Sequence, residues 1–210
     1  MNDAVHAFQF SSARHQMETA FAGMWLFLAS EALFFGPLFL AWIYARHWNA
    51  AGFDAGAQQT SLTIGAVNTV ILLSSSYAYS VGLAFIEKGR VRAMTVCLVF
   101  AWLLGASFML LKFGVEWRED FRRSLFPGAT FSIDGPLRDG AQLFFIFYFI
   151  STAIHGLHLL VGLGLVAWIL ARARHFSASA HTPATIVGLY WGFVDMVWVM
   201  LFPLIYLIGR

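Results

Sequence analysis

The chain has 210 residues, of which 60% are hydrophobic and only 11% are charged, and its mean hydropathy is +0.71. Soluble domains contain about half apolar and about a quarter charged residues, so this composition excludes an ordinary soluble domain. It predicts a single membrane domain over residues 1–210. A formal net charge of +2 does not indicate a nucleic-acid-binding surface. The one cysteine, Cys97, can form neither an internal disulfide nor a cysteine metal site.

Five apolar stretches are each long enough to cross a bilayer, because about 20 helical residues span a hydrocarbon layer of about 30 Å. The chain therefore predicts an all-α bundle of five transmembrane helices. The expected spans are roughly residues 20–46, 59–86, 93–115, 141–171 and 183–208. Pro183 suits the first turn of the last helix. Residues 117–140 are expected to form the long loop, because they contain charges and the turn signals Pro127-Gly128 and Gly135-Pro136.

The orientation follows from where the basic residues lie. With five spans, the N-terminus shares a side with the loops 87–92 and 172–182. The lysines and arginines are divided almost equally between the two sides, but those on the N-terminal side lie in short loops beside the membrane. These residues are Arg14, Lys88, Arg90, Arg92, Arg172 and Arg174. The positive-inside rule acts on such loops and predicts a cytoplasmic N-terminus.

Two acids, Glu31 and Asp195, lie near the middle of their spans. An acid at the centre of a membrane helix costs about 2.5–3.5 kcal/mol on insertion scales, so it is a candidate functional residue. His155 and His158 lie at similar depth in the fourth span, and Asn68 lies in the second. Together these side chains predict a polar seam inside the bundle.

Several roles for this seam are open. The polar groups could simply bond neighbouring helices to one another. Glu31 could instead exchange a proton near a partner, or act as a buried hydrogen-bond anchor. A small metal site from His155, His158 and one acid is geometrically possible, whereas two histidines three residues apart on one helix point the same way and cannot bind a haem from opposite sides. Because no oxyanion hole or carboxylate-rich metal motif accompanies them, we expect no catalytic residue and no metal ligand in this chain.

Five motifs, in order, resemble subunit III of the haem–copper respiratory oxidases, in its short five-helix bacterial form. The first three cover Met24–Phe35 (MWLFLASEALFF), Asn68–Ser75 (NTVILLSS) and Phe108–Trp117 with Lys112 and Glu116. The fourth is His155-Gly156-Leu157-His158 with Gly162, and the fifth is Tyr190–Trp198 (YWGFVDMVW). The resemblance covers nearly all of residues 20–208.

The resemblance implies a non-catalytic subunit of a cytochrome c or quinol oxidase in the bacterial inner membrane. Such a subunit packs against catalytic subunit I, stabilises it, holds phospholipid between its helices and supports proton uptake. It binds no cofactor of its own, since haem and copper lie in the partner. The glutamate matching Glu31 is the residue that carbodiimides label in relatives, and Asn68, His155, His158 and Asp195 are expected to hold the helices in place around it.

Two alternatives remain beside this reading. One is an accessory subunit of a nitric oxide reductase, which shares the fold, and the other is a stand-alone membrane metalloenzyme or transporter. The chain departs from the family at Gly192, where relatives carry a histidine in the last motif. The electron donor, cytochrome c or quinol, is not encoded here because the donor site lies in other subunits.

Overall fold

The computed structural model describes residues 11–210, so the first ten residues of the predicted domain lie outside the described part of the chain. Five helices are long and apolar enough to cross a membrane, which confirms the all-α class. They are α1 (Ala13–Trp48), α3 (Leu62–Glu87), α4 (Val91–Met109), α6 (Arg138–Ala171) and α7 (Thr182–Phe202). The shorter helical segments are α2 (Ala50–Gln59), η1 (Leu110–Glu116), α5 (Trp117–Arg122), η2 (Ala173–His175) and η3 (Pro203–Leu207).

Two of the long helices pass into wider, π-helical turns before they end. In η1, which continues α4, the N–H of Trp117 bonds to the carbonyl of Lys112, five residues back. In η3, which continues α7, Pro203 lacks an N–H and so cannot make the regular helical bond. π-helical turns are rare and occur frequently at functional sites. The side chains of both segments are therefore candidates for a functional site.

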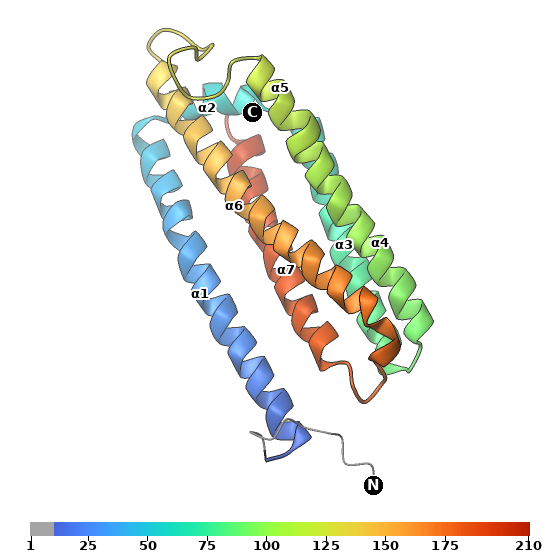
Figure 1. Cartoon of the computed structure of the whole chain (residues 1–210). Helices are drawn as coiled ribbons and strands as arrows, with labels where there is room; N and C mark the ends of the chain where they lie inside the picture. The colour runs from blue at the N-terminus through green and yellow to red at the C-terminus, as the bar shows by residue number, and fades with distance from the viewer. Residues whose placement is uncertain (1–10) are drawn as a thin grey trace.

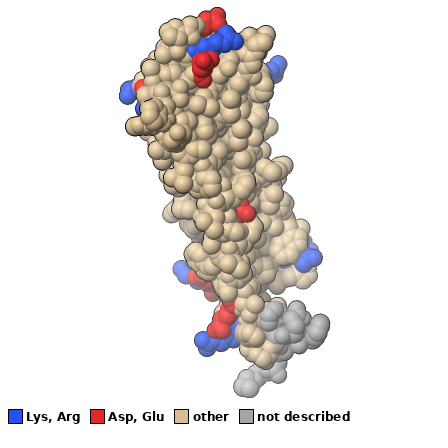
Figure 2. Space-filling model, turned by 90° about the vertical axis from the view of Figure 1, so that its left-hand side faces the viewer, with Lys and Arg blue, Asp and Glu red and all other residues tan. Residues whose placement is uncertain are grey.

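Helices α3, α4, α6 and α7 pack side by side into one group, and α1 lies along α6 and α7 at its edge (Figure 1). The start of α1 and the C-terminus lie at opposite ends of the molecule, as an odd number of spans requires. Lys, Arg, Asp and Glu side chains gather at the two ends, and the apolar band between them shows one isolated acidic group on the face turned to the viewer (Figure 2). This distribution is what a membrane-spanning protein needs.

The four packed helices approach closely where glycines face large rings. A Cβ added at Gly105 of α4 would lie 2.8 Å from the Trp191 ring, and one added at Gly162 of α6 would lie 3.2 Å from it. The Trp191 side chain of α7 is only 1% exposed. Glycines on two helices therefore make room for one indole, the small-against-large packing typical of membrane helices.

Helix α2 lies in a stretch where the sequence predicts no helix, and it crosses the end of the bundle beside α6 (Figure 1). A Cβ at Gly52 would lie only 2.5 Å from the Cα of Gly140, so the two backbones touch at a pair of glycines. At the other end of α2, Gln58 Nε2 donates to the carbonyl of Gly209 over 2.9 Å, which attaches the C-terminus. Tertiary contacts, rather than hydrophobic periodicity, hold this helix.

The predicted long loop 117–140 is wrong at both ends. Helix α5 extends the third span to Arg122, and α6 already begins at Arg138, which leaves residues 123–137 as the connection. The charges of this region suggested a loop, yet most of them lie within helix α5 or in the first turn of α6, such as Arg118 and Arg122 of α5. Charged residues close to an apolar run thus marked the membrane surface and not the end of the helix.

Candidate functional site

Helix α1 contacts the bundle along one narrow stripe. Its fully buried side chains are Leu28, Phe35 and Trp42, which are seven residues apart. Partly buried residues lie between and beside them, so that successive members of the stripe are alternately four and three residues apart. The stripe consists of Met24, Leu28, Glu31, Phe35, Leu38, Trp42 and Ala45. This is the spacing of a coiled-coil seam, and Glu31 is the one polar residue in it.

Glu31 contacts His158 of α6, a residue 127 positions away. The Oε2 atom of Glu31 lies 2.9 Å from Nε2 of His158, and the two side chains are 19% and 17% exposed. The ring of Phe35 covers the imidazole at a centroid distance of 5.2 Å. On α7, the Tyr190 hydroxyl donates to the carbonyl of His158 over 2.9 Å. The pair thus joins α1 to α6 in mostly apolar surroundings, with a small opening towards the outside.

The hydrogen bonds of His158 define how many protons the pair holds. Its Nδ1 lies 2.8 Å from the carbonyl oxygen of Ile154, which can only accept, so Nδ1 carries a proton. The contact between Nε2 and the Glu31 carboxyl then needs one proton as well. That proton lies either on a neutral glutamic acid or on a histidinium beside a carboxylate. In both states the pair is neutral, and one proton can move between the two atoms.

His155, by contrast, lies apart from this pair. It is 1% exposed and packs among rings of α4 and α7, with Phe108 at 5.6 Å and Trp198 at 5.2 Å between centroids. Neither ring nitrogen has a hydrogen-bond partner among residues 11–210. The predicted common stripe of His155 and His158 therefore divides between two neighbourhoods, because three residues turn a helix by about 300° and leave the two rings about 60° apart.

Asn68 and Asp195 are buried in the four-helix group, 0% and 3% exposed. Neither oxygen of the Asp195 carboxyl group has a hydrogen-bond partner among residues 11–210. The side-chain polar atoms of Asn68 also lack a partner within the described part of the chain. A buried polar group without a partner costs free energy, so both positions favour an ordered water or a neutral acid. Their expected role in holding the helices stays a prediction.

Gly192, where the related motif has histidine, faces a groove between α1 and α7. A Cβ placed on it meets no atom within 4 Å. The groove has a volume of about 560 Å³, and it is lined by Trp25, Leu28, Ala29, Ala32, Gly188, Leu189, Gly192, Phe193 and Met196. The missing side chain therefore leaves space against α1, close to Glu31 in sequence, and no neighbouring residue fills it.

A second polar cluster was not predicted as a site. It joins Lys112 and Glu116 of η1, Asp120 of α5, Tyr148 of α6 and Tyr206 of η3 through side-chain hydrogen bonds of 2.6–3.2 Å. Lys112, Glu116 and Asp120 are 0%, 2% and 4% exposed. Their spacing of four and four residues was the available signal, since it places the three on one face of a helix. The sequence reading took them as the membrane boundary instead.

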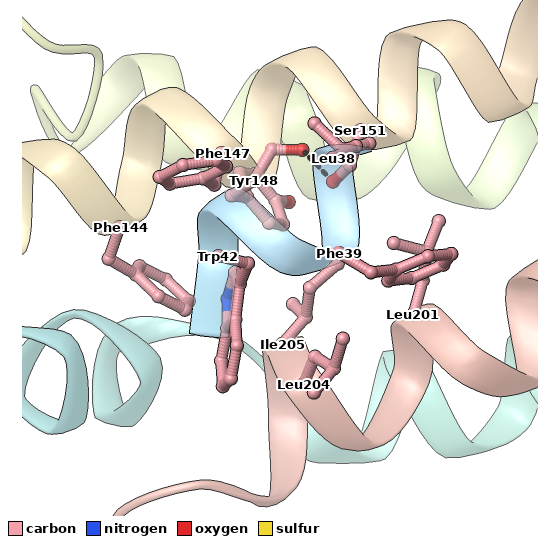
Figure 3. A pocket seen from close by; sticks show the side chains of 10 residues that line it. All are labelled: Leu38, Phe39, Trp42, Phe144, Phe147, Tyr148, Ser151, Leu201, Leu204 and Ile205. Atoms are coloured by element: carbon pink, nitrogen blue, oxygen red, sulfur yellow. Dashed lines mark hydrogen bonds between the residues drawn. The ribbon is translucent and has the colours of Figure 1, made fainter. Parts of the chain in front are cut away.

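Among residues 11–210, no group of three or more His, Cys, Asp and Glu side chains is arranged to hold a metal ion. A small space beside Tyr148, between α1, α6, α7 and η3, has a volume of about 10 Å³, room for about one water molecule. Leu38, Phe39 and Trp42 of α1 close it from one side (Figure 3). Apolar side chains thus seal the second cluster from α1.

The fold and its charge pattern define an all-helical protein that crosses the membrane several times. Residues 6–210 match the family model for cytochrome c oxidase subunit III. The chain is 31% identical, over 90% of its length and 87% of the relative's, to a cytochrome c oxidase subunit 3 from Thermostichus vulcanus. It is 30% identical to the cytochrome bo(3) ubiquinol oxidase subunit 3 of Pseudomonas aeruginosa, over 89% and 84% of the two chains.

A heme-copper oxidase subunit I+III from Aeropyrum pernix is 27% identical over 89% of this chain, which matches 22% of that longer protein. The chain belongs to the cytochrome c oxidase subunit III family. The resemblance drawn from the five motifs is thereby confirmed, as is the function of a haem–copper oxidase subunit III in aerobic respiration and electron transport. The nitric oxide reductase alternative is not favoured, because these relatives are named as oxidase subunits.

Proposed function

We propose that this chain is the non-catalytic subunit III of a bacterial terminal oxidase in the inner membrane, that it packs against catalytic subunit I, and that it supports proton uptake by that partner. The name of the relative that joins subunits I and III in one chain supports the choice of partner. In this proposal haem and copper belong to the partner subunits, and this chain contributes helices, bound phospholipid and a protonatable contact.

The contact between Glu31 and His158 carries the proton part of the proposal. It is the polar interruption of the α1 seam, it lies at mid-span, and its side chains remain partly exposed. At mid-span this exposed part faces lipid or a partner subunit, so in this proposal the proton reaches the pair through the partner and without unfolding of the bundle. The competing role, a hydrogen bond that fixes the register of α1, requires no proton movement.

The orientation is part of the same proposal. The start of α1, the α3–α4 connection and the α6–α7 connection lie at one end of the molecule (Figure 1). Short basic segments at that end favour the cytoplasmic side under the positive-inside rule. The second polar cluster, at the end with α5, then lies towards the extracytoplasmic side.

The test is oxygen consumption by the purified complex over many turnovers, from about pH 6 to about pH 9, a range that contains the pKa of free histidine, about 6.5. Glu31→Gln keeps the size and the hydrogen-bonding ability of the side chain but cannot donate a proton to solution. We expect normal assembly and a rate that declines more steeply than that of the wild type as pH rises, because proton supply becomes limiting there.

Glu18→Gln is the matched control, since it makes the same change on the same helix in an exposed pair with Arg14. His158→Gln should reproduce the Glu31→Gln profile, and the double variant should be no slower than either, because the two residues act as one unit. A Glu31→Gln complex with wild-type kinetics over the whole range would reject the proton role and leave the anchoring role.

A further inference from the structure

The buried cluster at the α5 end of the bundle holds more negative than positive charge. Lys112 provides one cation, and Glu116 and Asp120 provide two acids. Lys112 lies six residues before Arg118, the first exposed charged residue that follows it on this helix, which is about 9 Å along the axis, and its side chain is fully buried. An uncompensated charge in such surroundings is costly, and the usual solution is that one group becomes neutral.

The hydrogen bonds identify Lys112 as the charged ammonium. The Tyr206 hydroxyl donates to Oε1 of Glu116 over 2.6 Å. The Tyr148 hydroxyl donates to Oδ2 of Asp120 over 2.7 Å, which is a shorter contact than its 3.2 Å to Oε1 of Glu116. The O–H groups are thus both occupied, so the 2.7 Å and 3.0 Å contacts of these oxygens with Nζ use lysine N–H groups. A third N–H reaches Oε2 of Glu116 over 3.1 Å. Three donated bonds require the protonated amine.

The two acids are not equivalent. Both oxygens of Glu116 accept a hydrogen bond, Oε2 from Lys112 and Oε1 from Tyr206, which is the pattern of an ionised carboxylate. The hydrogen bond to Asp120 uses only Oδ2, and this residue is the most exposed acid of the cluster. Asp120 therefore has an oxygen available for a proton, and it lies nearer than Glu116 to the α5 end of the helix.

The neighbouring charges do not supply a second buried cation. Arg123 acts on Asp120 from the next turn, but its guanidinium is 54% exposed and pairs with Glu119 at 2.9 Å. The ammonium of Lys112 lies 5.7 Å from the ring centroid of Trp198. The imidazole of His155, whose nitrogens have no hydrogen-bond partner among residues 11–210, packs on the same ring. No group in the described part of the chain stabilises a positive charge on this imidazole by a hydrogen bond, so His155 does not compensate the negative charge of the two acids.

We propose that the cluster of Lys112, Glu116, Asp120, Tyr148 and Tyr206 is a proton-binding site, in which one proton resides on Asp120 and exchanges with water at the α5 end of the protein. Its ligand is a single proton, and release leaves a carboxylate whose charge the Tyr148 hydroxyl and Lys112 oppose. The site is separate from the contact of Glu31 with His158 and does not depend on the function proposed for that contact.

Infrared difference spectroscopy of the intact complex tests this proposal, because a protonated carboxyl and a carboxylate absorb in separate regions. We expect Asp120→Asn to remove one protonated-carboxyl band, which in the wild type shifts in deuterated water and disappears reversibly as pH rises. Glu119→Gln, the adjacent acid on the same helix, should leave that band in place. Glu31→Gln should leave it as well.

Glu116→Gln is the second variant, which covers a failure of Asp120→Asn to assemble. It leaves one acid for one lysine, so the protonated-carboxyl band should again be lost. Loss of a carboxylate band instead of a protonated-carboxyl band in Asp120→Asn would show that both acids are ionised and would overturn the proposal. If the protonated-carboxyl band of the wild type stays unchanged at every pH at which the complex is intact, the site does not exchange its proton with water, and the proposal is overturned.

Discussion

Replacing Lys112 by methionine is expected to be among the most damaging single substitutions in the chain. Methionine fills much of the same space but removes the ammonium, so Glu116 loses its ion partner at 3.1 Å while it stays 2% exposed. Removing one partner of a buried pair costs about 3–5 kcal/mol, because the remaining charge is left uncompensated. Because about 1.4 kcal/mol corresponds to a tenfold change in an equilibrium constant, the population of the folded or assembled state should fall roughly a hundredfold to several thousandfold.

The assay is retention of this subunit in the detergent-solubilised complex as temperature is raised, compared between Lys112→Met, Glu116→Gln and the double variant. The double variant should recover most of the loss, because two neutral side chains replace the pair. Lys88→Met, the same change at the exposed end of α3, is the control and should have no effect. A Lys112→Met subunit that is retained as well as the wild type, with no coupling to Glu116, would refute this view of the cluster.

Two further substitutions test the packing of the site. Gly52→Val should weaken the attachment of α2 by about 1–3 kcal/mol, the usual cost of overpacking, because its Cβ would lie 2.5 Å from the Cα of Gly140. Protease cleavage of the complex within residues 49–60 should then become faster. An unchanged cleavage rate would contradict the close contact. Gly192→His should change the stability of the subunit by no more than about 1 kcal/mol, because no atom lies within 4 Å of the added Cβ. Loss of the subunit from the complex after this change would show that the groove beside α1 is occupied.

Most of the fold could be predicted from the sequence because apolar length alone identifies a membrane helix. Helix α2 could not, since a ten-residue segment with two glycines has no such signal and depends on its contact with Gly140. The site could be predicted only in part. Glu31 stood out as an acid at mid-span, but its partner His158 is distant in sequence and only the packing of α1 on α6 brings the two together.

The cluster around Lys112 shows a different limit. Its residues were visible in the sequence, yet charges at the end of an apolar run indicate a membrane boundary as readily as a buried network. The deciding information is that the hydroxyls of Tyr148 and Tyr206 come from α6 and η3 to meet them. Long-range partners of this kind have no local pattern.

The two ionisable sites differ in what a substitution can reveal, because they lie in parts of the molecule that are packed differently. Only 17% of an apolar 18-residue stretch of α1 is buried, against 50% of such a stretch in the last span, and α1 is held by a single stripe of side chains. A substitution in the contact between Glu31 and His158 therefore disturbs few packed side chains, and we expect a loss of turnover in Glu31→Gln to reflect proton exchange and not assembly. Lys112 joins three segments of the core, η1, α6 and η3, so its removal acts first on assembly, and only the size-matched changes at Asp120 and Glu116 separate proton binding from structural support.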